Sequence, residues 1–260
     1  MKDKKLIGMV HLPALPGSPA WDGTAIEDIA EMALADVLVL ERSGFDGAMV
    51  QNSLDRPTRM NVDQLTVALM SAILARVRLA TTVTLGVNVV KNDGAAAVAI
   101  AAATGAEFVR VKVLTGARVS AEGIATGCAY ETMQARRDCG AQLSVWADIM
   151  EPTSRSLLES NFADDARDAL ELGAADAIVV TGGDLQSTLS LARRARELRP
   201  DAHVIIGGGV NASSVAEALN CAHTVIVGSA LKSEPGIRGR NDFSACLEVA
   251  RAAGIAKAGR

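Results

Sequence analysis

The chain has 260 residues, of which 49% are hydrophobic, 22% charged and 3% aromatic, and its formal net charge at pH 7 is −4. This composition is that of a globular protein long enough to bury a large core. The mild acidity, the lack of a basic run and the scarcity of aromatic residues argue against nucleic acid as a partner. No apolar stretch reaches the length of a transmembrane helix.

Eight β-rich runs alternate along the chain with amphipathic or Ala-rich stretches. We predict strands over Leu6–Val10, Gly47–Val50, Thr82–Val87, Phe108–Val111, Leu143–Ala147, Ala177–Val180, His203–Ile206 and Thr224–Val227. We predict helices over Ile26–Arg42, Val62–Val77, Gly94–Thr104, Thr126–Cys139, Asn161–Leu172, Leu185–Leu198, Ser213–Leu219 and Asp242–Ala252. Regular alternation of this kind indicates parallel strands joined by right-handed crossovers.

The number of strand–helix units and the chain length favour an α/β fold, a single (β/α)8 TIM barrel over residues 1–260. An open doubly wound sheet is the competing architecture. Such a sheet usually has fewer strands, and no GxGxxG follows the first predicted strand.

The four cysteines, Cys128, Cys139, Cys221 and Cys246, show no CxxC spacing. We interpret them as reduced thiols rather than as a disulfide framework or a zinc site. We therefore expect a cytoplasmic protein.

Active sites of TIM barrels lie at the carboxyl ends of the strands. Of the three histidines, only His11 falls at such an end, where it could move a proton or hydrogen-bond a ligand. Its alternative role is to hold the loop that follows. His203 begins the seventh predicted strand and His223 comes just before the eighth, so we expect them at the opposite end of the barrel, in structural roles.

Lys112 and Asp148 are the other candidate catalytic residues. Lys112 follows the fourth strand and could pair with a phosphate or carboxylate, or form a Schiff base if desolvated. Asp148 follows the fifth strand, with Glu151 nearby, and could act as a base. No cofactor is expected, but Asp148 with water ligands could hold a divalent metal ion. Arg110 has the same strand parity as Lys112, so both could point the same way.

Several further residues at strand ends are candidates for substrate binding. Asn52, Asn88 and Thr181 suit substrate hydroxyls, with loop hydrogen bonding as the alternative. Arg118, in a long loop after the fourth strand, could clamp a phosphate or carboxylate, or lie on the surface.

Two glycine-rich loops follow the last two strands. Glycines let main-chain N–H groups approach a ligand without a Cβ in the way, and this position commonly holds a phosphate in barrels. We therefore expect a phosphate to bind the main chain of Gly208, Gly209, Gly228 and Ser229.

Four segments together resemble the BtpA/SgcQ family: Val10–Pro19, Gly86–Asp93, Val111–Val119 and Ile226–Lys232. The resemblance implies a barrel related to ribulose-phosphate-binding enzymes. By the same resemblance, one branch of the family is associated with photosystem I biogenesis and another with sugar-metabolism gene clusters.

The chain departs from the family pattern on the predicted ligand face. Members usually have asparagine where Lys112 stands, a Lys-His pair where Met150–Arg155 lies, and Gly-x-x-Thr-Gly where the chain reads Thr181–Leu185. These departures allow a different substrate.

Two functions follow from these observations. The first is an enzyme acting on a small phosphorylated sugar or related metabolite by proton transfer, as an isomerase, epimerase or aldolase-like lyase. The second is a non-catalytic assembly or stability factor for photosystem I biogenesis. In either case we expect a homo-oligomer.

Overall fold

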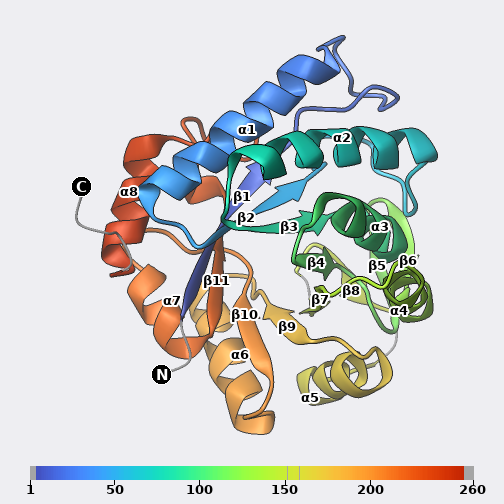
Figure 1. The fold of residues 1–260 in the computed structure, drawn as a ribbon. Coiled ribbons are helices and arrows are strands. Elements are labelled where there is room, and N and C mark those ends of the chain that lie inside the picture. Colours follow the sequence, from blue (N-terminus) through green and yellow to red (C-terminus); the bar gives the residue numbers. More distant parts are fainter. Residues whose placement is uncertain (1–3, 151, 158, 255–260) are drawn as a thin grey trace.

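The computed structural model describes residues 4–150, 152–157 and 159–254, and within them eight parallel strands close into a barrel (Figure 1). The strands are β1 (Lys5–His11), β2 (Gly47–Gln51), β3 (Thr84–Asn88), β4 (Phe108–Val111), β7 (Ser144–Ile149), β9 (Ala177–Val180), β10 (His203–Ile206) and β11 (Thr224–Val227). β1 pairs with β11, with Leu6 opposite Val225, so the sheet has no open edge. The predicted (β/α)8 barrel is confirmed, and the open sheet is excluded.

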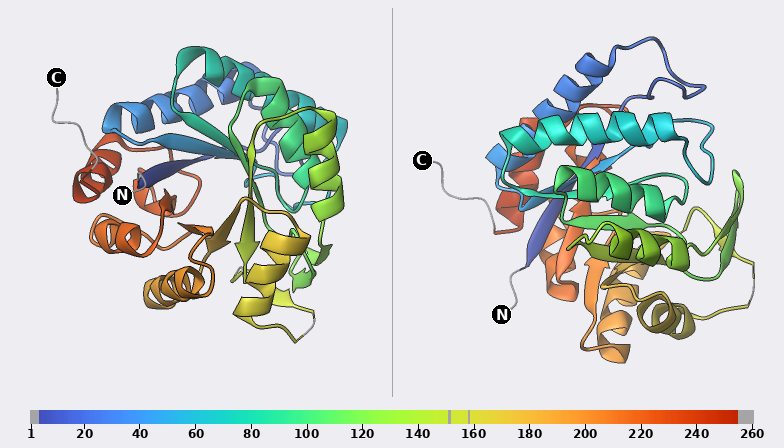
Figure 2. Two further views of the ribbon diagram at one scale, coloured as in Figure 1. Left: turned by 60° about the horizontal axis from the view of Figure 1, so that its bottom comes forward. Right: turned by 45° about the vertical axis from the view of Figure 1, so that its right-hand side comes forward.

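The helices form a layer outside the strands (Figure 2). They are α1 (Ile26–Ser43), α2 (Gln64–Ala80), α3 (Gly94–Thr104), α4 (Ala129–Asp138), α5 (Phe162–Arg167), α6 (Leu185–Leu198), α7 (Val215–Cys221) and α8 (Phe243–Ala252). After α5 the chain continues in a π-helical turn, Asp168–Leu172. None of the helices in the described residues is long and apolar enough to cross a membrane.

The prediction was wrong at the start of the fourth helix, because that segment belongs to a second, smaller sheet. Strands β5 (Ala117–Ser120) and β6 (Gly123–Thr126) form an antiparallel hairpin, and β8 (Arg155–Ser156) pairs with β5. Gly123 has φ +112°, a left-handed conformation that glycine adopts readily. The two strands of the hairpin are only four residues long and mostly exposed, so their sequence is a weak strand signal.

The interior of the barrel is filled by inward-facing side chains around two aromatic rings. Phe108 and Trp146 stack with their centroids 3.7 Å apart. Gly86 faces this pair, and a Cβ at that position would lie 2.0 Å from the Phe108 ring. The glycine therefore makes room for the phenylalanine, and the packed interior forms a floor beneath the carboxyl ends of the strands.

The amino-terminal end of the barrel repeats one hydrogen bond four times. The bond occurs once in each of four strand pairs: β1 with β2, β3 with β4, β7 with β9, and β10 with β11. In each pair, the residue that precedes the later strand accepts a hydrogen bond from the main-chain N–H of the second residue in the earlier strand. The pairs are Leu6 N with Asp46 Oδ2 (2.7 Å), Leu85 N with Glu107 Oε2 (2.8 Å), Val145 N with Asp176 Oδ2 (2.8 Å) and Val204 N with His223 Nδ1 (3.1 Å).

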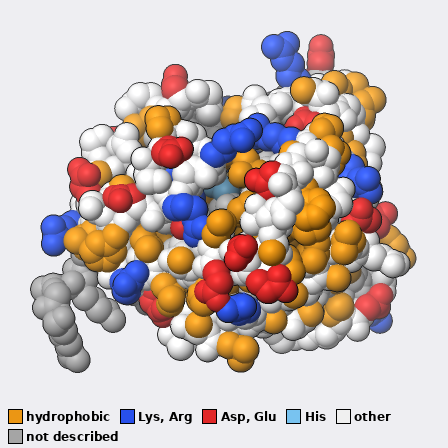
Figure 3. Space-filling view, turned by 90° about the horizontal axis from the view of Figure 1, so that it is seen from above, with side chains coloured by type: hydrophobic (Ala, Val, Ile, Leu, Met, Phe, Trp, Pro, Cys, Tyr) orange, Lys and Arg blue, Asp and Glu red, His pale blue; other side chains and the backbone are white. Residues whose placement is uncertain are grey.

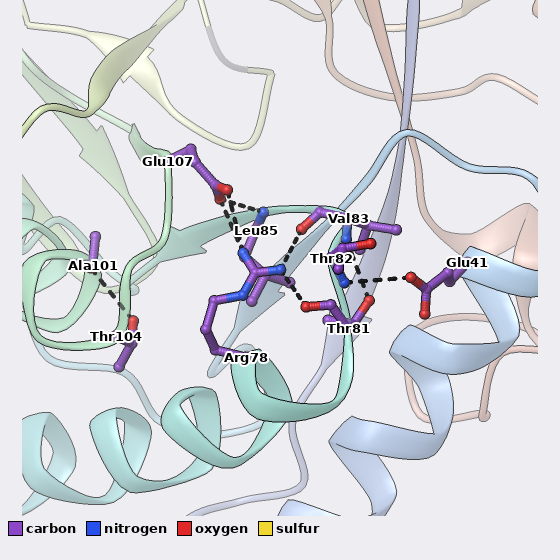
Figure 4. Close-up of polar contacts among 9 residues, drawn as sticks. All are labelled: Glu41, Arg78, Thr81, Thr82, Val83, Leu85, Ala101, Thr104 and Glu107. Carbon is purple, nitrogen blue, oxygen red and sulfur yellow. Dashed lines mark hydrogen bonds and ion pairs between the residues drawn. The ribbon is translucent and has the colours of Figure 1, made fainter.

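Figure 4 shows the second of these bonds. Glu107 also accepts from Arg78, which donates to the main-chain oxygens of Thr81 and Val83 and so ties α2 to the start of β3. His203 contacts the Thr224 hydroxyl at 2.9 Å. The predicted structural roles of His203 and His223 at this end of the barrel are confirmed.

Candidate functional site

A layer of polar side chains lies above the apolar interior, at the carboxyl ends of the strands. His11 ends β1, Gln51 ends β2 and Asn88 ends β3. Each lies an even number of residues from an inward-facing position on its strand, as His11 does from Met9, so these side chains face the barrel interior. Lys112 and Thr181 come one residue after their strands.

The layer opens into a cavity of about 920 Å³, which is within the usual range for small-molecule sites. Loops after β2, β3, β7 and β11 and the tip of the β5–β6 hairpin surround it. The lining residues are His11, Gln51, Ser53, Arg56, Pro57, Thr58, Val90, Lys91, Lys112, Ala121, Glu122, Thr153 and Ile237. Figure 3 shows a hollow in which a histidine side chain is visible, with Lys and Arg side chains along its rim.

Asp148 is buried beside this cavity between two cations. Arg110 contacts both carboxylate oxygens, with Nε 2.7 Å from Oδ1 and an Nη atom 3.0 Å from Oδ2. Lys112 Nζ lies 3.2 Å from Oδ2. Burial by itself raises the pKa of Asp148, but the charges of Arg110 and Lys112 outweigh it and hold the pKa below the ordinary value.

The position of Asp148 differs from the sequence-based expectation. Asp148 belongs to β7 itself rather than to the loop after it. Its carboxylate is ionised and held by its partners, which makes it a poorer proton acceptor than a free carboxylate. Glu151, the neighbouring carboxylate expected from sequence, lies outside the described residues.

His11 is held in its neutral form. Burial, together with the nearby charge of Lys232, lowers its pKa to about 3. Its Nδ1 atom is buried and has no hydrogen-bond partner in the described residues. Lys232 is itself buried and donates to the main-chain oxygen of Met9 (3.3 Å), and burial lowers the pKa of Lys232 to about 8.

Two further buried atoms at the strand ends also lack partners in the part of the chain that the structure describes. They are Asn88 Oδ1, whose amide nitrogen donates to the Arg110 carbonyl (2.7 Å), and Thr181 Oγ1. An unsatisfied buried polar atom costs free energy. Unpartnered atoms on His11, Asn88 and Thr181, at the ends of three strands, are therefore suited to a polar ligand.

The glycine loops lie next to this layer. A Cβ on Gly228 would be 3.8 Å from Cε1 of His11 and 3.4 Å from Met9, both ordinary contacts. A Cβ on Gly207 would lie 3.1 Å from the Arg110 guanidinium. Gly209 has φ +74°, which favours glycine. The loops thus lie close to both His11 and the Arg110–Asp148 pair.

Two of the predicted binding residues, Asn52 and Arg118, make hydrogen bonds within the protein and do not line the large cavity. Asn52 accepts from the main chain of Val90 (2.9 Å) and donates to Asp55 (3.0 Å), and it does not line the large cavity. Arg118 donates to the side chain and the main chain of Ser154 (2.7 and 3.0 Å). It borders a separate cavity of about 60 Å³ together with Lys112 and Asp148.

Arg56, Lys91 and Lys232 were not predicted from the sequence. Gln51 is a polar residue at a strand end that was given no role, although it has the parity of the inward-facing Met49 and Asn52 has the opposite parity. The four cysteines are free thiols. Among the described residues, no three His, Cys, Asp or Glu side chains come together as possible metal ligands.

The model of the BtpA family matches residues 2–253. The chain belongs to the BtpA family. Photosystem I biogenesis protein BtpA of Synechocystis is 34% identical, and the match covers 89% of this chain and 82% of that protein. The sgc region protein SgcQ of Escherichia coli is 28% identical, with 89% and 87% covered.

A solved structure shows the same fold as this BtpA-family chain. N-(5'-phosphoribosyl)anthranilate isomerase of Pyrococcus furiosus superposes with a TM-score of 0.56 at 16% identity, over 96% of this chain and 98% of that one. At this identity the likeness shows the fold alone.

Proposed function

We propose that this BtpA-family protein is an enzyme that acts on a small phosphorylated sugar or related metabolite by proton transfer. The observation that carries the proposal is the position of neutral, half-buried His11. It contacts the large cavity and lies next to the Gly228 loop. A ligand whose phosphate bound the glycine loops would thus place its remaining atoms beside His11.

The phosphate would bind main-chain N–H groups around Gly208, Gly209, Gly228 and Ser229. Lys232 lies close enough to lower the pKa of His11, so its charge would also favour an anion here. The structurally similar Pyrococcus isomerase is named for a phosphoribosyl substrate, which agrees with a phosphate site in a barrel of this fold.

The reaction we propose begins with removal of a proton from a carbon next to a carbonyl. The neutral imidazole of His11 takes the proton, and the electron pair moves onto the carbonyl oxygen, which becomes an enolate. Lys112 stabilises that negative charge. Return of the proton to the same carbon from the opposite face gives an epimer. Its return to the former carbonyl carbon, while the proton of the adjacent hydroxyl moves to the former carbonyl oxygen, gives an isomer. Asp148 holds Lys112 and Arg110 in place.

An anionic ligand would also adjust His11 for this role. A pKa of about 3 makes the imidazole a weak base. A phosphate next to it favours the protonated form and so raises the pKa toward neutral values.

A thermal-shift screen against inorganic phosphate and phosphorylated sugars tests the proposal. A ligand at a hundred times its Kd stabilises the folded protein by about 2.7 kcal/mol. Gly228→Ala should abolish the shift, because the added methyl has room in the protein but lies where the anion binds. Gly183→Ala is the control, since a Cβ there meets no atom within 4 Å. Equal shifts in both variants would contradict the phosphate site.

The name of the Synechocystis relative supports a second candidate, a non-catalytic factor for photosystem I biogenesis. A Synechocystis strain lacking its BtpA separates the two. If this chain restores photosystem I in that strain, our proposal requires that the restoration be lost when the site is mutated. Equal restoration by His11→Gln and Lys112→Met variants would favour the non-catalytic role.

We also propose that the protein is a cytoplasmic homo-oligomer. Light scattering on the purified chain measures the oligomeric state, and fractionation of cells measures the location.

A further inference from the structure

The loop between β2 and α2 carries a second set of groups suited to an anion. Ser53, Arg56 and Thr58 all line the large cavity. The hydroxyl oxygens of Ser53 and Thr58 are buried and have no hydrogen-bond partner among the described residues. A guanidinium next to two unused hydroxyl donors has the chemistry of a site for a carboxylate or phosphoryl group.

The charge balance of the described cavity lining supports the same conclusion. It contains three cations, Arg56, Lys91 and Lys112, and one carboxylate, Glu122, in a protein of net charge −4. Glu122 pairs with Lys91, whose Nζ is 3.2 Å away. Arg56 donates from Nε to the main-chain oxygen of Ser53 (3.2 Å) and forms no ion pair with a carboxylate of the described residues.

The loop is held in place by contacts on its far side. Asp55 accepts from the main chain of Leu15 (2.7 Å) and from Asn52. Asn52 in turn accepts from Val90. Asp55 does not line the large cavity, so its negative charge does not face an anion bound on the cavity side of the loop. These contacts hold the main chain of the loop that carries Ser53 and Arg56.

We infer that the ligand carries a second anionic group, at the end remote from its phosphate, and that Ser53, Arg56 and Thr58 bind it. This rests on the proposed function, which places the phosphate at the glycine loops after β10 and β11. β11 pairs with β1, and β1 pairs with β2, so the two anion sites lie on either side of His11. The substrate class is a phosphorylated sugar acid or a sugar bisphosphate.

Matched ligands test this inference by calorimetry and thermal shift at constant ionic strength. Glucose 6-phosphate has one anionic group, 6-phosphogluconate adds a carboxylate, and fructose 1,6-bisphosphate adds a second phosphoryl group. Wild-type protein should bind at least one of the two-anion ligands about tenfold or more tightly than glucose 6-phosphate. Which one it prefers distinguishes a sugar acid from a bisphosphate.

Three variants assign that preference to the loop. Arg56→Gln should remove the preference and leave glucose 6-phosphate affinity within about twofold. Ser53→Ala breaks no hydrogen bond within the described residues, so it should keep the fold and reduce only the two-anion affinity. Arg59→Gln removes the same charge from the same loop at an exposed position that does not line the large cavity, so it should change nothing.

The outcomes separate this inference from the proposed function. If glucose 6-phosphate binds as tightly as both two-anion ligands, or if Arg56→Gln weakens all three equally, the second site is wrong while the phosphate site stands. If no phosphorylated compound binds, or if Gly228→Ala binds these compounds as tightly as wild type does, the proposed function is wrong, and this inference is then wrong as well.

Discussion

Arg110 and Asp148, from the neighbouring barrel strands β4 and β7, form a two-point ion pair at the mouth of the barrel, with separations of 2.7 and 3.0 Å. Their side chains are 7% and 2% exposed. At this depth an isolated charge is strongly destabilising. Loss of either partner should therefore destabilise the fold as well as change the charge at the site.

Asp148→Asn should lower the free energy of unfolding by about 3–5 kcal/mol, because it leaves Arg110 buried without its anion. Lys112→Met leaves the Arg110–Asp148 pair intact and should cost clearly less. Urea denaturation of the three proteins measures both values. An Asp148→Asn protein as stable as wild type but inactive would instead support the sequence-based assignment of Asp148 as the catalytic base.

The neutral state of His11 predicts a pH dependence of stability. Its pKa is about 3 in the folded protein and about 6.5 in the unfolded chain. Between these values the unfolded state takes up a proton that the folded state does not. Stability should therefore fall as pH drops from about 6.5 toward 3, and His11→Gln should reduce that slope. Parallel pH profiles for wild type and His11→Gln would show that His11 is not held neutral in the folded protein.

Ligand binding should be accompanied by proton uptake at His11. A bound phosphate raises the pKa of His11, so some protons enter the complex near pH 6. Calorimetry in two buffers of different ionisation enthalpy measures the number taken up. The uptake should be lost in His11→Gln; if it persists there, another group is responsible.

Lys112 should act through its charge and not through a Schiff base. Its ammonium forms an ion pair with the Asp148 carboxylate, 3.2 Å away, and this contact holds the positive charge at the wall of the large cavity. Borohydride treatment in the presence of substrate should leave the protein mass unchanged, whereas an adduct mapped to Lys112 would establish covalent catalysis. Lys112→Met should raise KM or lower kcat without preventing folding.

The repeated hydrogen bonds at the amino-terminal end of the barrel should contribute measurably to stability. Asp46→Ala leaves the Leu6 N–H without its acceptor and should cost about 1–3 kcal/mol. Asp201→Ala removes a carboxylate whose side chain is 76% exposed and should leave the denaturation midpoint unchanged. Denaturation midpoints that are equal for the two variants would refute the role given to this contact.

The strand and helix pattern that specifies the barrel could be predicted from sequence because its signals are local. An apolar run such as Ala177–Val180 and the amphipathic segment after it can be recognised from their own residues. Position at the carboxyl end of a strand likewise placed His11 and Lys112 at one end of the barrel. Parity on the second strand would have indicated that Gln51 faces the interior and Asn52 does not.

Tertiary structure alone decided which of these residues meet. Arg110 and Asp148 are separated by 38 positions, and no local pattern predicts that their charges cancel across two strands. Lys232 approaches His11 only because β11 closes the barrel against β1. The Ser53–Arg56–Thr58 set is likewise visible only once folding has buried two hydroxyls without partners. Burial and long-range pairing set the charge states of the site, and both arise from packing that is not encoded in any short segment of the chain.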